Sequence, residues 1–589
     1  MPHTLESIAA WRRLRLPDDI TPYHAAALAI FEEMRARPAL DGPALNAILR
    51  RHPRDGRHVF SKNLLVRLYR ELCARGDLAP DAELERRLRM KPVRTLSGVA
   101  TVTVLTRPHP CPGDCLFCPT DPSMPKSYLP DEPGAQRAAQ HDFDPHAQVA
   151  ARLSALDSNG HPTDKIELLV LGGTWSSYPR TYQEWFVHRC LDAMNGRDAP
   201  TLAEAQAWNA TAAHRNVGLV VELRPDEVNA VRIRRLRAFG VTKVQIGVQS
   251  LDDRVLALNR RGHDAATTRR ALTLLRAAGL KLVVHWMPNL LGATPAGDLA
   301  DFARLWSDPA LRPDELKIYP CVLLRGTPLH DAWRQGRYTP YDDATLVELV
   351  AAAKTQVPPW CRINRIYRDI PTHHVVAGCR LSNLRQEAQR HLADAGGRCR
   401  CIRCREVRDR QLEPGALTLG VRRYATAAGE EHFIAFETAV PAAETTVAEE
   451  DRPASAQTAG ETRPTGDPPD QLAGYARLWL PDRPIPLGMP ELAGAALVRE
   501  LHIYGRALPI GDRSHGEAQH RGLGTRLLAA AEELAARRGH RRVAVIASVG
   551  TRRYYADRGY RLEGTYMVKS LAPRAAGRGP ASRMEGADR

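Results

Sequence analysis

The chain has 589 residues, of which 43% are hydrophobic and 25% charged, and its formal net charge is +16. This hydrophobic content excludes a largely disordered chain, and the length is enough for about three or four domains. The sequence has no run of about 18 apolar residues and no apolar stretch near its N-terminus, so we expect a cytoplasmic protein with neither a membrane-spanning helix nor a secretory signal.

Residues 1–95 have the pattern of helices interrupted by prolines, as in TPYHAAALAIFEEMRARP. Positive charge is concentrated in two segments. Residues 1–110 contain 19 Lys and Arg against 12 Asp and Glu, and residues 360–412 contain 12 Arg against 5 acidic residues. Such surfaces attract polyanions, so we interpret residues 1–95 as a basic helical module that binds nucleic acid. The alternative is a solvated surface in a chain rich in arginine.

Residues 96–355 alternate six short β-rich runs with helical stretches. The runs are VATVTVL (99–105), IELLVLGG (166–173), VGLVVEL (217–223), TKVQIGVQ (242–249), LKLVVHW (280–286) and ELKIYP (315–320). This alternation predicts βα units and a parallel sheet, and six repeats suit a partial (β/α)6 barrel better than a closed eightfold one. We therefore expect an α/β protein whose chemistry lies at the carboxyl ends of these strands.

The first cysteine cluster follows the first strand with the spacing Cys-x3-Cys-x2-Cys, at Cys111, Cys115 and Cys118. Three thiolates on one loop can hold three irons of a [4Fe-4S] cluster and leave the fourth iron open. The alternative is a structural zinc site with His109 as the fourth ligand. The spacing, the strand and the barrel pattern favour the open cluster. Together they resemble the radical S-adenosylmethionine superfamily, in which the open iron binds the amino and carboxylate groups of that cofactor.

This resemblance implies a role in cofactor binding for polar and glycine residues at the ends of later strands. These residues are Gly172, Gly173, Thr174, Glu222, Gln249 and Ser250. Taken singly, each is weak, because a glycine pair at a strand end is usually only a tight turn. The register that they share favours the functional reading.

The segment 356–412 is a basic, cysteine-rich linker that contains the second cluster, Cys399, Cys401 and Cys404. This spacing fits a structural zinc site that needs one more ligand. The candidates for that ligand are His373, His374 and His391. The alternative is a set of thiols that bind no metal.

Residues 413–571 form the last expected domain. A Gln-x-x-Gly-x-Gly turn, with Gly522 and Gly524, leads into a helix at about 521–539, where backbone N–H groups can hold a pyrophosphate. Residues 441–470 have seven acids, two arginines, five prolines and no aromatic residue, which predicts a disordered insertion within a hairpin. The tail 572–589 is also expected to be disordered.

The order of turn, helix, strand and short helix in this domain resembles the GCN5-related acetyltransferases, which bind acetyl-CoA. The strand ELHIYG (500–505) would then lie against the thioester, with Glu500 and His502 on it. Of Tyr554 and Tyr555, one is expected to pack in the core, and the other to donate a proton to the departing thiolate.

From about residue 90 to 570 the chain resembles the catalytic subunit of Elongator and its single-chain prokaryotic relatives. Segments that carry the likeness include ELRPDE, QIGVQS, NRRGHD, PPWCRINRIYRDIP, RELHIYG, QHRGLGTRLLAAAEELA and GTRRYYADRGY. Three features depart from the family pattern: only three residues separate Cys111 from Cys115 where relatives more often have a longer gap, CPTDP replaces a glycine-rich CPGG, and the acidic insertion is unusual.

The resemblance implies synthesis of 5-carboxymethyluridine at the wobble position of tRNA. A 5′-deoxyadenosyl radical would take hydrogen from the methyl group of acetyl-CoA, the resulting radical would add to uridine C5, and hydrolysis of the thioester would follow. It also implies the tRNA anticodon stem-loop and an electron donor as partners. The implied acetyl-CoA contacts are Lys165, Glu500, Leu501, His502, Ile503, Ala518, Gln519, His520 and Tyr555.

Two rival interpretations belong to other classes. The first is a protein lysine acetyltransferase with a structural iron–sulfur cluster, against which the basic segments argue. The second is a tRNA-binding scaffold with degenerate catalytic modules, against which the intact cysteines and the intact glycine turn argue.

Overall fold

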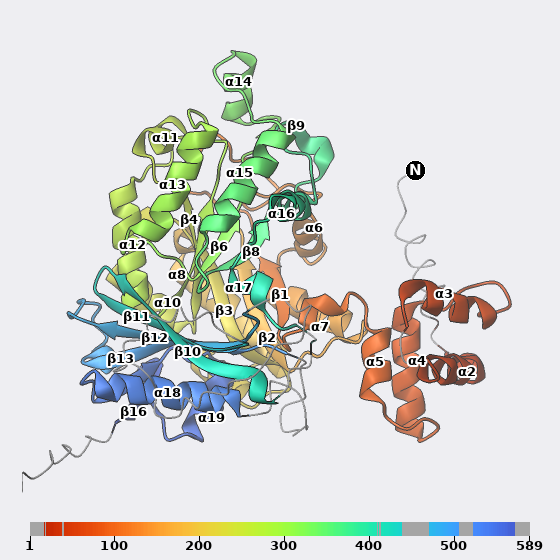
Figure 1. Ribbon diagram of the computed structural model, residues 1–589. Helices are drawn as coiled ribbons and strands as arrows, with labels where there is room; N and C mark the ends of the chain where they lie inside the picture. Colours follow the sequence, from red (N-terminus) through yellow and green to blue (C-terminus); the bar gives the residue numbers. More distant parts are fainter. Residues whose placement is uncertain are drawn as a thin grey trace, which may run out of the picture.

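The computed structural model describes residues 17–571 apart from 18, 38–39, 409, 411–413, 439–469 and 506–521. These residues form a helical module, a parallel half-barrel and a second, mostly antiparallel sheet, which lie around the three largest hydrophobic clusters (Figure 1). No helix in the described part of the chain is long and apolar enough to cross a membrane. The tail 572–589 and all of the acidic insertion except Asp470 fall outside these residues.

The N-terminal module has a small apolar core of its own at one side of the molecule (Figure 1). Its helices are α2 (His24–Arg35), α3 (Gly42–Arg51), α4 (Lys62–Arg75) and α5 (Ala82–Leu88), and the 3-10 turns η1 (Thr21–Tyr23) and η2 (Pro92–Thr95) flank them. Asp41 caps α3 by accepting a 2.8 Å hydrogen bond from the amide of Ala44. Arg70 connects the module to the barrel through a 2.9 Å ion pair with Asp157.

The half-barrel is a sheet of seven parallel strands in the order β1-β2-β3-β4-β5-β6-β8. The strands are β1 (Ala100–Leu105), β2 (Lys165–Leu171), β3 (Arg215–Leu223), β4 (Lys243–Gln249), β5 (Lys281–Trp286), β6 (Glu315–Ile318) and β8 (Arg362–Ile366). The first six are those expected from the sequence. A seventh strand, β8, comes from the segment read as a linker and pairs with β6.

Helices return the chain between these strands and cover the outer face of the sheet (Figure 1). They are α6 (Pro133–Ala139), α7 (Pro145–Asp157), α8 (Arg180–Asn195), α9 (Leu202–Asn209), α10 (Ala230–Ala238), α11 (Asp253–Leu258), α12 (Ala265–Ala277), α13 (Pro295–Ser307), α14 (Pro328–Arg334), α15 (Asp343–Gln356) and α16 (Leu384–Asp394). A two-stranded sheet of β7 (Leu323–Leu324) and β9 (Val375–Ala377) lies beyond β6 and β8.

The second sheet has the order β10-β11-β12-β13-β14-β16-β15 and follows the short helix α17 (Ile402–Arg405). Its elements are β10 (Leu417–Thr426), β11 (Gly429–Thr438), β12 (Leu472–Pro481), β13 (Ala495–Ile503), α18 (Leu523–Arg537), β14 (Arg542–Val545), α19 (Arg552–Ala556), β15 (Arg561–Glu563) and β16 (Tyr566–Ser570).

The acidic insertion joins β11 and β12, which are antiparallel and paired as far as Glu437 and Leu472. Its position within a hairpin is therefore as expected. Asp470, which we assigned to the disordered segment, is instead buried and lies 3.4 Å from Arg398. The ion pair with Arg398 therefore holds Asp470 in place at the end of the insertion.

Candidate functional site

A cavity of about 560 Å³ opens at the carboxyl ends of the barrel strands. Residues at or just after the end of every strand line it, from Cys111 after β1 to Arg368 after β8. Chemistry is expected at this face, because the loops that follow parallel strands all meet here. The cavity is thus the place to look for the residues that the sequence singled out.

All three cysteines of the first cluster line this cavity. Among the described residues their sulfurs do not all lie within 4.8 Å of one another, unlike those of the second cluster. The separation suits three different irons rather than a single zinc ion. His109 is engaged elsewhere, since its Nε2 lies 3.0 Å from the carbonyl oxygen of Ser177 and its ring stacks on Tyr178.

Two arginines surround the sulfur of Cys115. Arg261 Nη1 donates to Cys115 Sγ over 2.9 Å, and Arg224 Nη1 lies 3.9 Å from the same atom. Burial raises the pKa of the neighbouring Cys118 thiol to about 11. Burial disfavours a thiolate at Cys118, and a bound metal cation would compensate for this.

Glycines bring the backbone close to the cysteine loop. A Cβ on Gly172 would lie 1.8 Å from Thr106 Oγ1, and a Cβ on Gly113 would lie 1.8 Å from Arg224 Nη1. Gly172 and Gly173 have φ values of +133° and +89°. Thr174 follows them, and its Oγ1 lies 3.7 Å from Cys111 Sγ. Only glycine fits between β1 and β2 at this point, which explains the pair at the strand end.

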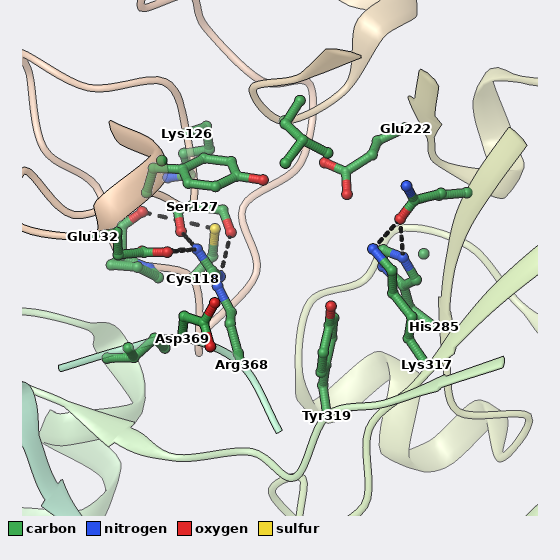
Figure 2. A pocket seen from close by; sticks show the side chains of 18 of the residues that line it. Cys118, Lys126, Ser127, Glu132, Glu222, His285, Lys317, Tyr319, Arg368 and Asp369 are labelled. Atoms are coloured by element: carbon green, nitrogen blue, oxygen red, sulfur yellow. Dashed lines mark hydrogen bonds and ion pairs between the residues drawn. The ribbon is translucent and has the colours of Figure 1, made fainter. Parts of the chain in front are cut away.

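The cavity wall opposite the cysteines carries polar side chains from the strands themselves (Figure 2). Gln245 Oε1 accepts hydrogen bonds from His285 Nε2, over 2.9 Å, and from Lys317. Burial raises the pKa of Glu222, although Lys317 and Arg368 oppose this shift. A half-buried carboxyl and a nearby amine can both bind a polar heterocycle.

A second polar group lies near the cysteine side of the cavity (Figure 2). Arg368 donates to Ser127 Oγ over 2.7 Å and to Glu132 Oε1 over 3.0 Å, and its guanidinium lies 5.0 Å from the centre of the Tyr128 ring. The Oε1 of Gln249 is shielded from solvent and has no hydrogen-bond partner among the described residues, and its φ is +70°. An unsatisfied buried acceptor of this kind is typical of a ligand site.

Sequence reasoning missed several residues of this cavity: Gln245, His285, Lys317, Tyr319, Arg261 and Arg368. The signal that was available is a polar side chain at an inward position of an otherwise apolar strand, as in KVQIGV and KLVVHW. Such a residue is hard to reconcile with a purely apolar barrel core.

Lys165 and Glu500, two of the residues expected to contact acetyl-CoA, lie at the other end of the barrel. Lys165 is the first residue of β2, and Glu500 on β13 forms an ion pair with Lys281, the first residue of β5. Glu500 Oε2 also accepts from Arg477 Nε over 2.9 Å. Burial alone would raise the pKa of Glu500, but Lys281 and Arg477 lower it to about 2. His502 is partly buried beside this group, and desolvation lowers its pKa to about 4.

Strands β13 and β14 pair only over Ala495–Val498 and Arg542–Val545, and β13 then continues to Ile503. The helix α18 begins directly after Gly522, whose φ is +72°. A Cβ on Gly524 would lie 3.0 Å from the hydroxyl of Tyr554. Ala518, Gln519 and His520 lie outside the described residues. Leu501 therefore lies on the part of β13 that extends beyond its pairing with β14.

Tyr554 and Tyr555 occupy different environments. Tyr555 belongs to the hydrophobic core of this sheet and packs edge-on against Tyr560. The Tyr554 ring is only partly buried, and the Arg558 guanidinium lies 3.7 Å from its centre. Of the two hydroxyls, that of Tyr554 faces the first turn of α18.

The sulfurs of Cys399, Cys401 and Cys404 lie within 4.8 Å of one another. Among the described residues no histidine completes this group. His373 and His374 contact Asp131 instead, so their prediction as fourth ligands was wrong, and His391 joins no group. The Lys354 ammonium is fully buried and has no hydrogen-bond partner among the residues that the structure describes, and it opposes the rise in the pKa of the Cys404 thiol.

Several arginines of the basic segment 360–412 form ion pairs with acidic residues of the same chain. Arg362 lies 2.7 Å from Glu406, Arg368 lies 3.0 Å from Glu132, and Arg405 lies 2.7 Å from Glu437. Arg390 and Arg398 keep 65% and 47% of their side-chain surface exposed. Only part of the excess charge is therefore available to a polyanion.

Comparisons with known proteins agree with this geometry. The model of the Radical SAM superfamily matches residues 109–304, and that of the Radical_SAM C-terminal domain matches residues 313–394. A tRNA uridine(34) acetyltransferase of Dehalococcoides mccartyi is 42% identical over 483 residues, which are 81% of this chain and 99% of that protein. The parallel half-barrel is thus a radical S-adenosylmethionine domain.

More distant relatives match over a similar length. Elongator complex protein 3 of Homo sapiens is 35% identical, over 82% of this chain and 86% of that protein. The solved structure of the archaeal Elp3 of Methanocaldococcus infernus, with residues 1–46 deleted, superposes with a TM-score of 0.67 at 33% identity. The likeness covers 81% of this chain and 100% of that one, so it includes both sheets.

Proposed function

Because the chain belongs to the family of tRNA uridine(34) acetyltransferases and Elongator complex protein 3, we propose that it forms 5-carboxymethyluridine at the wobble position of tRNA, with S-adenosylmethionine and acetyl-CoA as co-substrates. The observation that carries the proposal is the cavity at the carboxyl ends of the strands, which joins three cysteines to a polar wall. A cavity with a purely structural role would not need three thiols together with buried polar groups.

Cys111, Cys115 and Cys118 hold three irons of a [4Fe-4S] cluster in this proposal. A reduced cluster bound there would supply the electron that radical chemistry on S-adenosylmethionine requires. The chain's own contribution is to orient the cofactor and exclude water. Gly172 and Gly173 leave space beside the cluster, and the unsatisfied Gln249 Oε1 accepts from the cofactor's amino group.

The polar wall binds the target uridine. The amide of Gln245 and the Lys317 ammonium donate to uracil carbonyl oxygens, while Glu222, which faces the same space (Figure 2), keeps its assignment to S-adenosylmethionine. The Tyr319 hydroxyl points into this space (Figure 2). The ring of Tyr319 supplies a surface on which a base can stack. Such a cavity admits only a base that is turned out of its strand, as the single-stranded anticodon loop permits.

Acetyl-CoA binds along the part of β13 that extends beyond its pairing with β14. The pyrophosphate of acetyl-CoA lies at the start of α18, and the thioester lies beside Glu500–Ile503. Tyr554 donates a proton to the departing thiolate, because its hydroxyl faces the first turn of α18. Neutral His502 accepts a proton from the water that cleaves the thioester. Tyr555, by its position in the core, supports this site from beneath.

The second cysteine cluster binds a structural zinc ion. The close approach of its three sulfurs, and the buried Lys354 ammonium beside them, suit three thiolates and a divalent cation. Helix α17 joins the two sheets, because Ile402 N donates to Cys361 O and Val407 N donates to Leu472 O over 2.9 and 3.1 Å. The metal therefore fixes the junction between the half-barrel and the second sheet.

The N-terminal module and the exposed arginines of 360–412 hold the anticodon stem-loop through its phosphates. This part of the proposal predicts binding that weakens steeply as salt is raised, because each neutralised phosphate releases counterions. Binding of tRNA that does not respond to salt would contradict the basic surface without bearing on the chemistry of the cavity.

An anaerobic assay tests the whole proposal. Reconstituted full-length protein is incubated with tRNA, acetyl-CoA, S-adenosylmethionine and a reductant, and nucleosides are analysed by mass spectrometry. We expect carboxymethyluridine from the unaltered chain and none from Cys115→Ala. Cys73→Ala is the matched control, because Cys73 is a thiol of the N-terminal module far from the cavity in sequence and fold. Unmodified tRNA together with acetylated lysine on a protein substrate would support the lysine acetyltransferase instead.

A further inference from the structure

Two histidines and an aspartate meet at the rim of the cavity, outside both cysteine clusters. His373 and His374 lie in the 3-10 turn η5 (Thr372–His374) that follows β8, and Asp131 lies just before α6. His373 Nε2 is 2.8 Å and His374 Nε2 is 2.7 Å from Asp131 Oδ2. The two imidazole rings are 4.2 Å apart between centres. Two segments more than 240 residues apart in sequence thus present three donor atoms to one point.

The chemistry of these three atoms is that of a transition-metal site. Imidazole nitrogen and carboxylate oxygen are ligands that Zn²⁺ and similar divalent ions prefer, and all three atoms lie within 4.8 Å of one another. Movements of a few tenths of an ångström bring them to metal-ligand spacing. The second carboxylate oxygen, Asp131 Oδ1, is shielded from solvent and has no hydrogen-bond partner within the described part of the chain. A bound cation satisfies that oxygen as well.

A plain surface ion pair is the competing explanation, but it accounts for less. Exposed pairs contribute about 0–1 kcal/mol, and both histidines here would compete for a single oxygen while its neighbour is left without a partner. The His373 side chain is 69% exposed and that of Asp131 33% exposed. An ion at this point would have three protein ligands and one open side toward solvent.

The group is built into the rim of the cavity. Asp131 is followed by Glu132, and the turn with the histidines comes soon after Arg368, so the Arg368–Glu132 pair lies beside it. Ser127, Glu132 and Arg368 all line the cavity. A metal ion at this point would join the segment downstream of the cluster cysteines to the loop after β8.

We propose that Asp131, His373 and His374 form a binding site for a divalent transition-metal ion of the Zn²⁺ class, separate from both cysteine clusters, which fastens the two loops at the cavity rim. The site needs no iron–sulfur cluster and no zinc at Cys399, Cys401 and Cys404.

Metal stoichiometry and a Co²⁺ spectrum test the site. Full-length protein is stripped with a chelator, loaded with Zn²⁺ under reducing conditions, desalted and analysed for zinc. The double variant His373→Ala/His374→Ala is expected to lose one equivalent per chain. The control His391→Ala, an exposed histidine of α16, is expected to lose none. Asp131→Asn retains a similar shape and provides a second variant if the double variant folds poorly.

Co²⁺ loading identifies the ligands. The difference spectrum between unaltered protein and the double variant should show weak visible bands without the intense near-ultraviolet absorption of sulfur bound to cobalt. Equal zinc content in all variants would overturn the proposal. A difference spectrum with sulfur absorption would also overturn it, because it would return the histidines to the second cysteine cluster.

Discussion

A buried network of charges connects the half-barrel to the second sheet, and Arg499 of β13 is at its centre. The fully buried guanidinium of Arg499 lies 2.5 Å from Asp314 before β6 and 2.8 Å from Glu431 of β11. It also donates to the carbonyl oxygen of Leu280 over 2.8 Å. Arg276 of α12 approaches Glu431 to 3.0 Å from the barrel side. The substitution Arg499→Leu removes the central cation and leaves two carboxylates partly uncompensated.

The expected cost follows from burial. Removal of one partner from a buried, hydrogen-bonded ion pair destabilises a protein by about 3–5 kcal/mol, because the remaining charge stays out of water. For a domain of roughly 150–250 residues, each kcal/mol lowers the melting temperature by about 2–4 °C, so Arg499→Leu should lower it by roughly 6–20 °C. Differential scanning calorimetry of the full chain measures this shift.

A matched substitution separates this effect from the loss of an arginine as such. Arg542 of β14 pairs with Glu563 at 2.5 Å, but the two side chains are 31% and 48% exposed. Arg542→Leu should therefore change stability by about 1 kcal/mol or less. If both variants melt within about 2 °C of each other, the network contributes no more than a surface pair, and the reasoning from burial is refuted.

Three further results are expected. Gly172→Ala should weaken S-adenosylmethionine binding by about tenfold or more, or about 1.4 kcal/mol, because the added Cβ meets Thr106. Gly539→Ala is the control, since Gly539 also has a positive φ but faces open space, and it should leave the affinity unchanged. Equilibrium binding of S-adenosylmethionine measures both. Arg261→Gln should lower the reduction potential of the reconstituted cluster in an EPR titration, because the N–H donor to Cys115 is lost, while exposed Arg260→Gln should leave it unchanged. Folding stability should fall from pH 7 to pH 5, because the pKa of His502 is about 4 in the folded chain against 6.5 in the unfolded chain, which therefore binds more protons. In a urea-unfolding series, His502→Gln should reduce the slope of the unfolding free energy against pH over that range. An unchanged slope would contradict the shift.

The strands of the half-barrel could be predicted because their apolar runs end in turn residues. The run IELLVLGG and the strand β2 differ by only a few residues at their ends. Strand β8, with the sequence RINRI, was missed because only Ile363 and Ile366 are buried in it, and arginine and asparagine at the other positions suppress the apolar signal. Pairing with β6, rather than composition, makes this segment a strand.

The cysteine loop was predictable, since covalent chemistry fixes its spacing locally. The polar wall was not, because Gln245 and Lys317 are 72 residues apart and become neighbours only through the order of the strands. The same limit misplaced His373 and His374. Their nearness in sequence to Cys399 suggested a shared site, whereas the fold turns them toward Asp131, more than 240 residues away. Sequence spacing reports contacts within one loop and is silent on contacts between loops.

The cysteine cavity and the proposed acetyl-CoA site lie at opposite ends of the same strands. Lys281 at the start of β5 contacts Glu500, and Met287, just after β5, lines the cavity with Cys115. At about 3.3 Å per residue, this strand separates the two ends by roughly 20 Å.

Loss of the cluster should therefore leave acetyl-CoA binding intact, and loss of the Tyr554 hydroxyl should leave cleavage of S-adenosylmethionine intact. Cys115→Ala should abolish 5′-deoxyadenosine and leave the affinity for acetyl-CoA within about twofold, whereas Tyr554→Phe should slow thioester cleavage and leave deoxyadenosine formation intact. Isothermal titration with acetyl-CoA and chromatography of the nucleosides measure both quantities. Loss of acetyl-CoA binding in a folded Cys115→Ala protein would mean that the cluster loop forms part of the acyl-donor site, and the separation read from the strands would then not describe the working enzyme.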